Sequence, residues 1–383
     1  MLKTLIFSIL KFYLPDRTRY MNTRAETKSS ILFAALDAVL GRNINKARLK
    51  LMSLFIIALN QVRTVSFEKL AIAFDNDAKT DSSLRRIQRF IAGFDLQYDL
   101  IARFIFSLLP ADPPYRLSLD RTNWKFGSKD INILVLAITY KGIAFPILFK
   151  VEPKAGNSST RQRIRIIEKY IELFGIETID CLLADREFIG KHWIEYLNRR
   201  NIKYHIRIRN NFWVTMPRTS KLVKASWLFN SLKINQFKFH ENIVLVNGVL
   251  CYISGSKVYD KNGKPELQII ISFNNPQRAN TLYKERWQIE SAFKALKTSG
   301  FNLEDTHLTE PDRVQKLFAL VIIAYTWAYI VGIQLNILKP ISIKKHGRRA
   351  KSLMVYGLDY IANILFSNDL DGLKNCCKFL SCT

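Results

Sequence analysis

The chain is poor in the residues that build disulfide frameworks and small metal domains. Its five cysteines include no C-x-x-C pair, and no cysteine–histidine cluster has zinc-finger spacing. The five histidines form no spaced cluster either, which favours structural or surface roles for them. An odd number of unpaired cysteines indicates reduced thiols, so we expect a cytoplasmic protein rather than a disulfide-bonded one.

Acidic residues are also scarce, with 32 Asp and Glu against 58 Lys and Arg and a formal net charge of +26. Such an excess of positive charge favours a polyanionic partner, because neutralising phosphates releases counterions. We therefore expect nucleic acid, with a ribosome-like or a membrane-surface protein as the alternatives. The 383 residues, 48% of them hydrophobic, are enough for two or three domains with a buried core, which excludes a disordered chain.

The N-terminal segment lacks a small-residue cleavage site after its short apolar run, which argues against a signal peptide. One uncharged stretch, from Leu317 to Leu338, is long enough to cross a bilayer. A buried central helix of a large domain has the same composition. We interpret this stretch as a buried helix and expect no membrane partner, because a single span would be unusual in so basic a chain.

The first 110 residues are expected to be an N-terminal extension (1–27) followed by a helical domain (28–110). Ser66 is a plausible N-cap, and Ser82 or Ser83 precedes a helix that ends at Gly93. The basic residues of that last helix are Arg85, Arg86 and Arg89. Three short helices of which the third is basic fit a DNA-binding domain, and a structural cap with a solvated basic face is the alternative.

The remaining chain alternates strands and helices. Residues 111–209 contain three strands, a helix, a strand, a helix and a strand, which predicts an α/β fold with a mixed sheet. Residues 210–266 have short alternating runs typical of a β-rich insertion. Residues 267–340 resume with the core strand "LQIIISF" and two helices, over 276–298 and about 311–338, and residues 341–383 form a basic C-terminal tail.

Two aspartates stand out because each follows an apolar strand. Asp120 ends "RLSLD", and Asp185 ends "CLLAD". Ligands of α/β folds bind at the carboxyl ends of the strands, so both side chains are candidates for one site if their strands are neighbours. The alternative is that each aspartate caps the turn or helix that follows it.

A third carboxylate, Glu290, lies in the predicted helix 276–298. With 3.6 residues per turn, Glu290 shares one narrow stripe with Tyr283, Arg286 and Lys297, and this stripe borders the apolar face. A solvated charge face would lie opposite the apolar residues. Arg286 and Glu290 form either an ordinary ion pair of ~0.3 kcal/mol or part of a site, and the helical pattern alone leaves both open.

Two aspartates and one glutamate at a sheet edge suit a specific chemistry. Mg²⁺ prefers hard oxygen ligands and keeps some of its waters. Two such ions ~4 Å apart can activate a nucleophile and stabilise the leaving oxygen in phosphodiester chemistry. The neighbouring arginine and lysine are suited to hold phosphate.

The segments "LSLDRTNWKFG", "LLADREFIG" and "YKERWQIESAFKALK" resemble the three acidic motifs of DDE transposases of the insertion-sequence-four (IS-four) group. The third has that group's Tyr-Arg-Glu-Lys pattern at 283, 286, 290 and 297, and the resemblance runs from about residue 30 to the end. It implies an RNase H-like catalytic domain with a β insertion. It also implies that Asp120, Asp185 and Glu290 are catalytic metal ligands and that Tyr283, Arg286 and Lys297 contact DNA phosphates.

The resemblance predicts an enzyme that cleaves the ends of an insertion sequence and transfers the 3′-hydroxyl to target DNA. It implies Mg²⁺ as the cofactor, which Mn²⁺ can replace, and a homodimer that binds double-stranded DNA at paired terminal inverted repeats. Two alternatives remain open at this point. One is an RNase H-like nuclease without strand transfer, and the other is a non-catalytic DNA-binding protein derived from a transposase.

Overall fold

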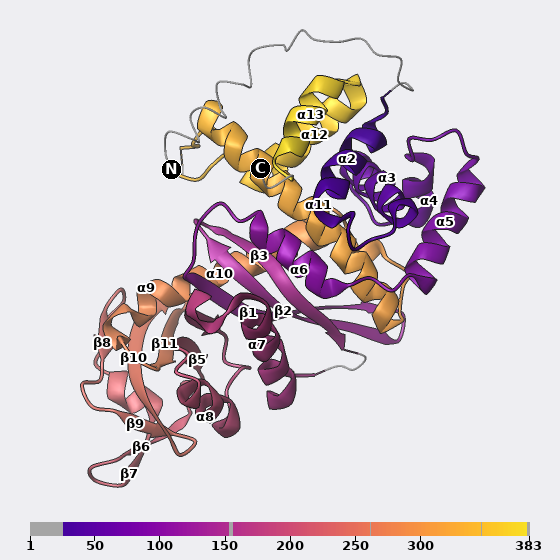
Figure 1. Cartoon of the computed structure of the whole chain (residues 1–383). Coiled ribbons are helices and arrows are strands. Elements are labelled where there is room, and N and C mark those ends of the chain that lie inside the picture. Colours follow the sequence, from indigo (N-terminus) through magenta and orange to yellow (C-terminus); the bar gives the residue numbers. More distant parts are fainter. Residues whose placement is uncertain (1–25, 153–155, 261, 346, 381–383) are drawn as a thin grey trace. The chain divides into compact units, whose positions relative to one another are not determined.

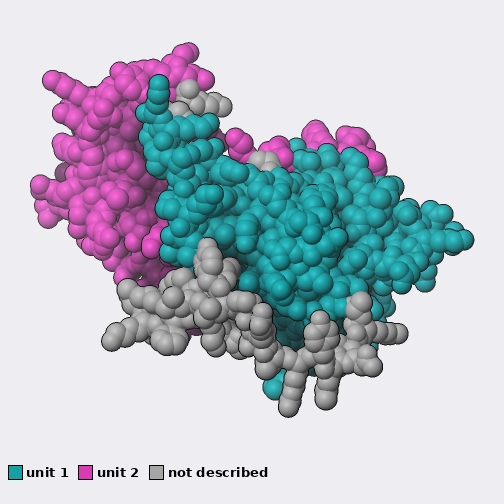
Figure 2. Space-filling view, turned by 90° about the horizontal axis from the view of Figure 1, so that it is seen from above, with its two compact units in different colours: residues 1–95, 300–305, 323–383 teal, residues 96–299, 306–322 magenta. Residues whose placement is uncertain are grey.

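The structure is a computed structural model that describes residues 26–152, 156–260, 262–345 and 347–380. The N-terminal extension predicted over residues 1–27 therefore lies almost entirely outside the described residues. The chain divides into two compact units, coloured separately in Figure 2. Unit 1 comprises residues 1–95, 300–305 and 323–383, and unit 2 comprises residues 96–299 and 306–322.

Unit 1 is helical. Thr27 caps α2 (Lys28–Leu40) through a reciprocal pair of bonds with Ser30, and Asn45 caps α3 (Lys46–Val62). The predicted N-cap Ser66 is confirmed, since its hydroxyl accepts a hydrogen bond from the Lys69 amide at the start of α4 (Phe67–Ile72). The basic helix α5 (Thr80–Gly93) ends at Gly93 as predicted, but it begins at Thr80, before the two serines that were expected to precede it.

The C-terminal residues also belong to unit 1. The segment expected to be a basic tail contains two helices, α12 (Leu353–Ser367) and α13 (Leu370–Lys378). α12 crosses α11 (Pro311–Leu338) at a pair of glycines, Gly332 and Gly357. A side chain does not fit at this crossing, because a Cβ at Gly332 would lie 1.9 Å from the Leu353 carbonyl oxygen. Apolar residues of this segment are buried, among them Met354, Leu358 and Ile361, so its helices pack within unit 1.

α11 is the uncharged stretch that resembled a membrane span. It is the one described helix long and apolar enough to cross a bilayer, and 89% of its apolar window is buried inside the structure. Phe318 and Trp327 are fully buried. The prediction of a buried helix is confirmed.

Unit 2 is built on one mixed sheet, drawn in Figure 1. Its first strands are β1 (Tyr115–Phe126), β2 (Lys129–Tyr140), β3 (Ile143–Glu152), β4 (Ile179–Ala184) and β5 (Tyr204–Ile208). β1 pairs in parallel with β4, and β4 pairs in parallel with β5, whereas β1, β2 and β3 are antiparallel. The predicted hairpin turn between β2 and β3 is confirmed, with Lys141 and Gly142 both at positive φ.

Helices flank the sheet of unit 2. They are α6 (Tyr98–Ser107), α7 (Thr160–Phe174) and α8 (Lys191–Arg199), and α7 begins with a Ser159–Gln162 capping box. α6 and α7 pack on β3. The predicted order of three strands, helix, strand, helix and strand is confirmed, and so is the α/β fold class with a mixed sheet flanked by helices.

The β-rich segment extends the sheet instead of standing apart from it. It contains β6 (Trp213–Met216), β7 (Lys221–Lys224), β8 (Phe237–Phe239), β9 (Val244–Val246) and β10 (Val249–Tyr259), and the predicted core strand "LQIIISF" follows as β11 (Pro265–Ser272). β11 pairs with β5 and β10 pairs with β11, so the sheet order is β3-β2-β1-β4-β5-β11-β10-β9-β6-β7, with β8 beside β10. Alternating residues predict a strand but not its neighbour, which is why this continuity was not expected.

The helix predicted over 276–298 is interrupted. A 3₁₀ turn (Pro276–Arg278) leads into α9 (Ala279–Tyr283), and a second 3₁₀ turn (Lys284–Arg286) separates it from α10 (Trp287–Lys294). Residues Ala295–Ser299 form a π turn. No Gly or Pro lies between 279 and 298, so the sequence carried no local signal for the break. The interruption coincides with Arg286, a charged residue that is buried in the candidate site.

Candidate active site

The parallel pair β1 and β4 places the two aspartates side by side. Their last paired residues are Leu119 and Ala184, so Asp120 and Asp185 are the next residues on the two neighbouring strands. Asp185 follows the end of β4 as predicted. Asp120 does not end its strand, because β1 continues to Phe126 in a hairpin with β2. The sequence suggested an end at Asp120 because the apolar run stops there. The strand continues through the polar residues that follow because they pair with β2.

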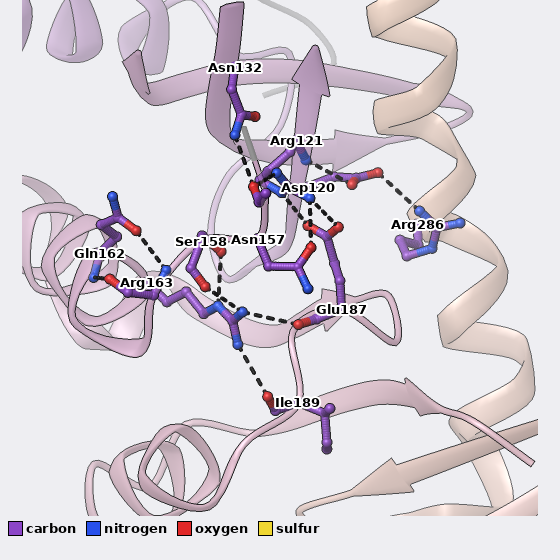
Figure 3. A network of polar contacts seen from close by, with 12 residues as sticks. Asp120, Arg121, Asn132, Asn157, Ser158, Gln162, Arg163, Glu187, Ile189 and Arg286 are labelled. Carbon is purple, nitrogen blue, oxygen red and sulfur yellow. Dashed lines mark hydrogen bonds and ion pairs between the residues drawn. The ribbon is translucent and has the colours of Figure 1, made fainter. Parts of the chain in front are cut away.

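One arginine lies among the carboxylates. Arg286, only 4% exposed, donates from Nη1 to Asp120 Oδ2 (3.1 Å) and from Nη2 to Glu290 Oε1 (2.5 Å). Its Nε donates to the Tyr283 hydroxyl (3.1 Å), which in turn donates to Asp185 Oδ1 (3.0 Å). The three predicted carboxylates are thus joined through one guanidinium and one phenol. Figure 3 shows the contact between Arg286 and Asp120.

Burial and charge set the protonation of this group. Burial raises the pKa of Asp120 to about 7, a shift that Arg286 opposes and that Glu187 and Glu290 increase. Burial also raises the pKa of Tyr283, so its hydroxyl keeps its proton and remains a donor. For Arg286 burial acts in the opposite direction, but Tyr283, Asp120 and Glu290 outweigh it and raise the pKa of the guanidinium. Arg286 therefore stays charged and serves as the counter-charge of the carboxylates.

Lys297, the fourth residue of the Tyr-Arg-Glu-Lys pattern, lies in the π turn. Its Nζ donates to the carbonyl oxygen of Asn123 (2.6 Å) and sits 5.6 Å from the centre of the Trp124 ring. Both contacts are to β1, beyond Asp120. In this structure Lys297 thus ties the end of α10 to the strand that carries the first aspartate.

Two arginines near Asp120, Arg121 and Arg163, both contact Glu187, as Figure 3 shows. Arg121 forms two hydrogen bonds of 2.7 Å with the carboxylate of Glu187. Arg163 of α7 is 4% exposed and bonds to Ser158 and to the backbone of Glu187. Arg163 was not among the site residues predicted from the sequence. A signal was present, because Arg163 shares a helical stripe with the apolar Ile167 and Tyr170, where a charged residue is unexpected.

The basic residues of α5 belong to unit 1, whereas the carboxylates belong to unit 2. Arg85 and Arg89 are exposed and Arg86 is half-buried, while Ile87, Phe90 and Ile91 form the buried face of α5. Arg85 and Arg89 therefore present positive charge on the solvent side of α5.

The carboxylate oxygens of this cluster are the type of ligand that a divalent cation prefers. Asp120, Asp185 and Glu290 offer hard oxygen atoms of the kind that Mg²⁺ prefers. Burial is the main reason why the pKa of Asp120 is raised, and the neighbouring Glu187 and Glu290 add to the shift. Within the described residues, no group of three or more metal-ligating side chains is gathered closely enough to hold an ion. The guanidinium of Arg286 lies between Asp120 and Glu290. These residues are suited to a metal by their chemistry, with Arg286 as the counter-charge that a metal would replace.

The comparisons with known proteins agree with this geometry. No curated protein matches the chain. The family model described as a transposase DDE domain matches residues 112–327, more than half of the chain. The matched range contains all three carboxylates and the whole sheet, and the mixed sheet flanked by helices is consistent with the RNase H-like domain of such enzymes. The chain therefore belongs to the DDE transposase family.

Proposed function

We propose that this transposase cleaves the ends of an insertion sequence and transfers the resulting 3′-hydroxyl to target DNA. The observation that carries the proposal is the joining of Asp120, Asp185 and Glu290 through Arg286 and Tyr283 at the point where the parallel pairing of β1 and β4 ends. Carboxylates at this place suit phosphodiester chemistry better than a structural role, because a fold gains little from burying several like charges together.

Asp120, Asp185 and Glu290 are the proposed metal ligands, and Mg²⁺ is the proposed ion, with Mn²⁺ as a substitute. When bound, a pair of such ions activates the attacking oxygen and stabilises the leaving one. The three residues would hold the ions where the pairing of β1 and β4 ends. Asp120 must be ionised to do so, and replacing the guanidinium by a divalent cation favours that form because the positive charge increases.

Arg286 and Tyr283 have two proposed roles. Without metal, they hold the three carboxylates in place through the contacts described above. With metal bound, the carboxylates no longer need Arg286 as their counter-charge, and its planar guanidinium suits a phosphate of the transposon end. Lys297 completes the Tyr-Arg-Glu-Lys pattern of the IS-four group, and we propose that it also contacts this DNA.

Residues 28–110 are the proposed DNA-binding domain. Arg85, Arg86 and Arg89 lie on the outer side of α5, and the net charge of +26 favours binding to a polyanion. A homodimer that pairs two terminal inverted repeats would bring two such domains and two carboxylate sites to the same DNA. We propose a catalytic part that consists of the core segments 111–209 and 267–340 with the β-rich insertion 210–266 between them. A basic C-terminal tail, residues 341–383, follows it.

The test uses the DNA that flanks the reading frame, because inverted repeats there are the substrate. The purified chain is incubated with a labelled end duplex, a target plasmid and Mg²⁺ or Mn²⁺. A transposase nicks the end and joins its 3′-hydroxyl to the plasmid. Nicking without joining would indicate a nuclease, and binding without metal-dependent nicking would indicate a non-catalytic protein derived from a transposase.

A further inference from the structure

Asp185 lies on a loop that the sheet does not hold. Pairing between β1 and β4 stops at Leu119 and Ala184, and Asp185 begins a turn closed by a bond from the Phe188 amide to the Asp185 carbonyl (2.9 Å). Asp120, by contrast, is held on both sides of its position by the β1–β2 ladder. Catalytic groups displaced by ~1 Å can lose about 100-fold in rate. Something beyond the ladder must therefore fix the loop of Asp185 against the strand of Asp120.

Arg121 makes the first connection. It directly follows Asp120 on β1, and its Nε and Nη2 donate to the two carboxylate oxygens of Glu187, two residues after Asp185, at 2.7 Å each. The same guanidinium donates to the carbonyl oxygen of Gly156 and to Asn157 Oδ1 (3.0 Å). A two-pronged contact of this kind fixes orientation as well as distance. The contact between Arg121 and Glu187 therefore constrains the distance between Asp120 and Asp185, because each of the two residues lies close to one aspartate in the chain.

Arg163 makes the second connection, from α7. Its Nη2 donates to the carbonyl oxygens of Ser158 (2.6 Å) and Glu187 (3.0 Å), and its Nε donates to Ser158 Oγ (2.9 Å). Nη1 reaches the Ile189 carbonyl oxygen (3.4 Å), and the guanidinium lies 5.1 Å from the centre of the buried Phe188 ring. Arg163 thus binds the backbone of the loop after Asp185, whereas Arg121 binds the side chain of Glu187 in the same loop (Figure 3).

The contacts of Arg121 also weigh against a role in DNA binding. A guanidinium has five N–H donors. Four N–H contacts of Arg121 go to Glu187, Gly156 and Asn157, and its side chain is only 15% exposed. A phosphate contact would require most of these bonds to break. Arg186, by contrast, follows Asp185 directly and is exposed.

We infer that Arg121, Arg163 and Glu187 form a bracket of positioning residues that fixes the Asp185 loop against Asp120 and so keeps the metal ligands together. Arg121 and Arg163 bind the loop at its side chain and backbone, and both also bind the segment 156–158 that precedes α7. The inference rests on the proposed function, because it assigns the bracket to the same carboxylate site. Residues that support metal ligands in this way typically change metal affinity ~10–100-fold when they are replaced.

The first experiment measures the loop itself and needs no metal. Amide hydrogen exchange of residues 185–190 is compared in the wild-type chain, Arg121→Met, Glu187→Gln and the double variant. We expect exchange in this loop to rise at least tenfold in both single variants, and the double variant to add little, because the two residues act as one pair. Arg165→Met is the matched control, since Arg165 lies on the solvent side of α7 and is exposed. Unchanged exchange in the single variants would overturn the inference.

The second experiment measures the site by titrating the full chain with Mn²⁺ alone, followed by electron paramagnetic resonance of the free ion. Arg121→Met and Glu187→Gln should weaken Mn²⁺ binding ~10–100-fold, and Arg121→Lys should recover part of the loss. A role that is merely structural would lower the melting temperature and leave Mn²⁺ binding as it is. A DNA contact would change DNA affinity and its salt dependence instead. Either pattern would overturn the inference.

Asp120→Asn separates this inference from the proposed function. If Asp120→Asn binds Mn²⁺ as the wild type does, the proposed metal site fails, and with it the assignment of the bracket to that site. If Asp120→Asn loses Mn²⁺ while the Arg121 and Glu187 variants keep it, only the bracket fails. Should Arg121→Met not fold, Glu187→Gln and Arg163→Lys carry the same two measurements.

Discussion

Arg286 and Arg85 are the same chemical group in opposite settings. Arg286 is 4% exposed and its guanidinium contacts Asp120, Glu290 and Tyr283, whereas Arg85 lies on the solvent side of α5. Burial among carboxylates makes an arginine part of the framework, because its removal would leave like charges without compensation. An exposed arginine contributes little to stability and is suited to phosphate. Charge alone therefore does not tell which arginines of a basic protein bind DNA.

The largest expected effect tests the buried side of this comparison through its carboxylates. Asp120→Asn, Asp185→Asn and Glu290→Gln should each lower end cleavage by at least about 10⁴-fold, the scale seen when a group acting within a catalytic unit is removed. The affinity for end DNA should stay within a few-fold, because the α5 arginines are untouched. Cleavage of a labelled end and a mobility-shift titration measure the two quantities. Full cleavage by any one variant would contradict the assignment of that residue.

The second prediction compares the two arginines directly through stability. Arg286→Ala leaves Asp120 and Glu290 without their shared partner, so the free energy of unfolding should fall by roughly 3–5 kcal/mol. Arg85→Ala removes an exposed side chain and should change it by no more than about 0.5 kcal/mol. Urea unfolding followed by circular dichroism gives both values. Equal losses in the two variants would mean that the buried network is not what distinguishes them.

The third prediction tests the exposed side. Replacing Arg85, Arg86 and Arg89 together by Ala should weaken DNA binding and reduce the slope of log affinity against log salt by about 2.7, if each arginine neutralises one phosphate. The stability of the protein should change little. Arg199→Ala, an exposed arginine on α8, is the control. An unchanged slope in the triple variant would indicate that α5 is a solvated face and not a DNA contact.

The smallest effect concerns a buried titratable group outside the carboxylate site. His205 on β5 is 2% exposed, contacts Ser272, and has its pKa lowered to about 4 by burial. An unfolded histidine has a pKa near 6.5, so the unfolded state binds more protons between these values. The contribution of His205 to stability is therefore complete above about pH 6.5 and is lost as the pH falls toward about 4.

The pH dependence is measured by urea unfolding of the wild type and His205→Gln between pH 4 and pH 7.5. The slope of stability against pH should differ between the two by at most about 1.4 kcal/mol per pH unit. The wild type should lose more stability on acidification, because only it has the histidine to protonate. Parallel curves would show that His205 is not the group responsible.

Several parts of the site were predictable because local pattern and tertiary structure agree. The apolar run before Asp185 forms β4 and places the aspartate just beyond it. The stripe shared by Arg286 and Glu290 survives as a direct ion pair. Each of these features follows from spacing along the chain, either the alternation of a strand or the turn of a helix. The hypothesis of an ion pair and the hypothesis of a site are thus both compatible with the same contact.

Other parts were not predictable because they depend on long-range neighbours. β1 continues to Phe126 only because β2 pairs with it. The 3₁₀ turn Lys284–Arg286 contains no Gly or Pro, so the sequence has no local signal for it. Glu187 and Arg163 lie 24 residues apart in the chain, and only the fold brings one to the other. Contacts of this kind are decided by which elements pack together, information that a window of sequence does not contain.

The sequence by itself determined the charge of the protein, its α/β order and the three acidic segments, because composition and periodicity are local properties. The tertiary structure decided which partners these charged residues have. It joined Asp120 and Glu290 on one buried guanidinium, linked Asp185 to it through Tyr283, and kept the arginines of α5 on a solvent face. The physical reason is desolvation: whether an ionisable group forms an internal ion pair or faces solvent depends on how deeply the fold buries it.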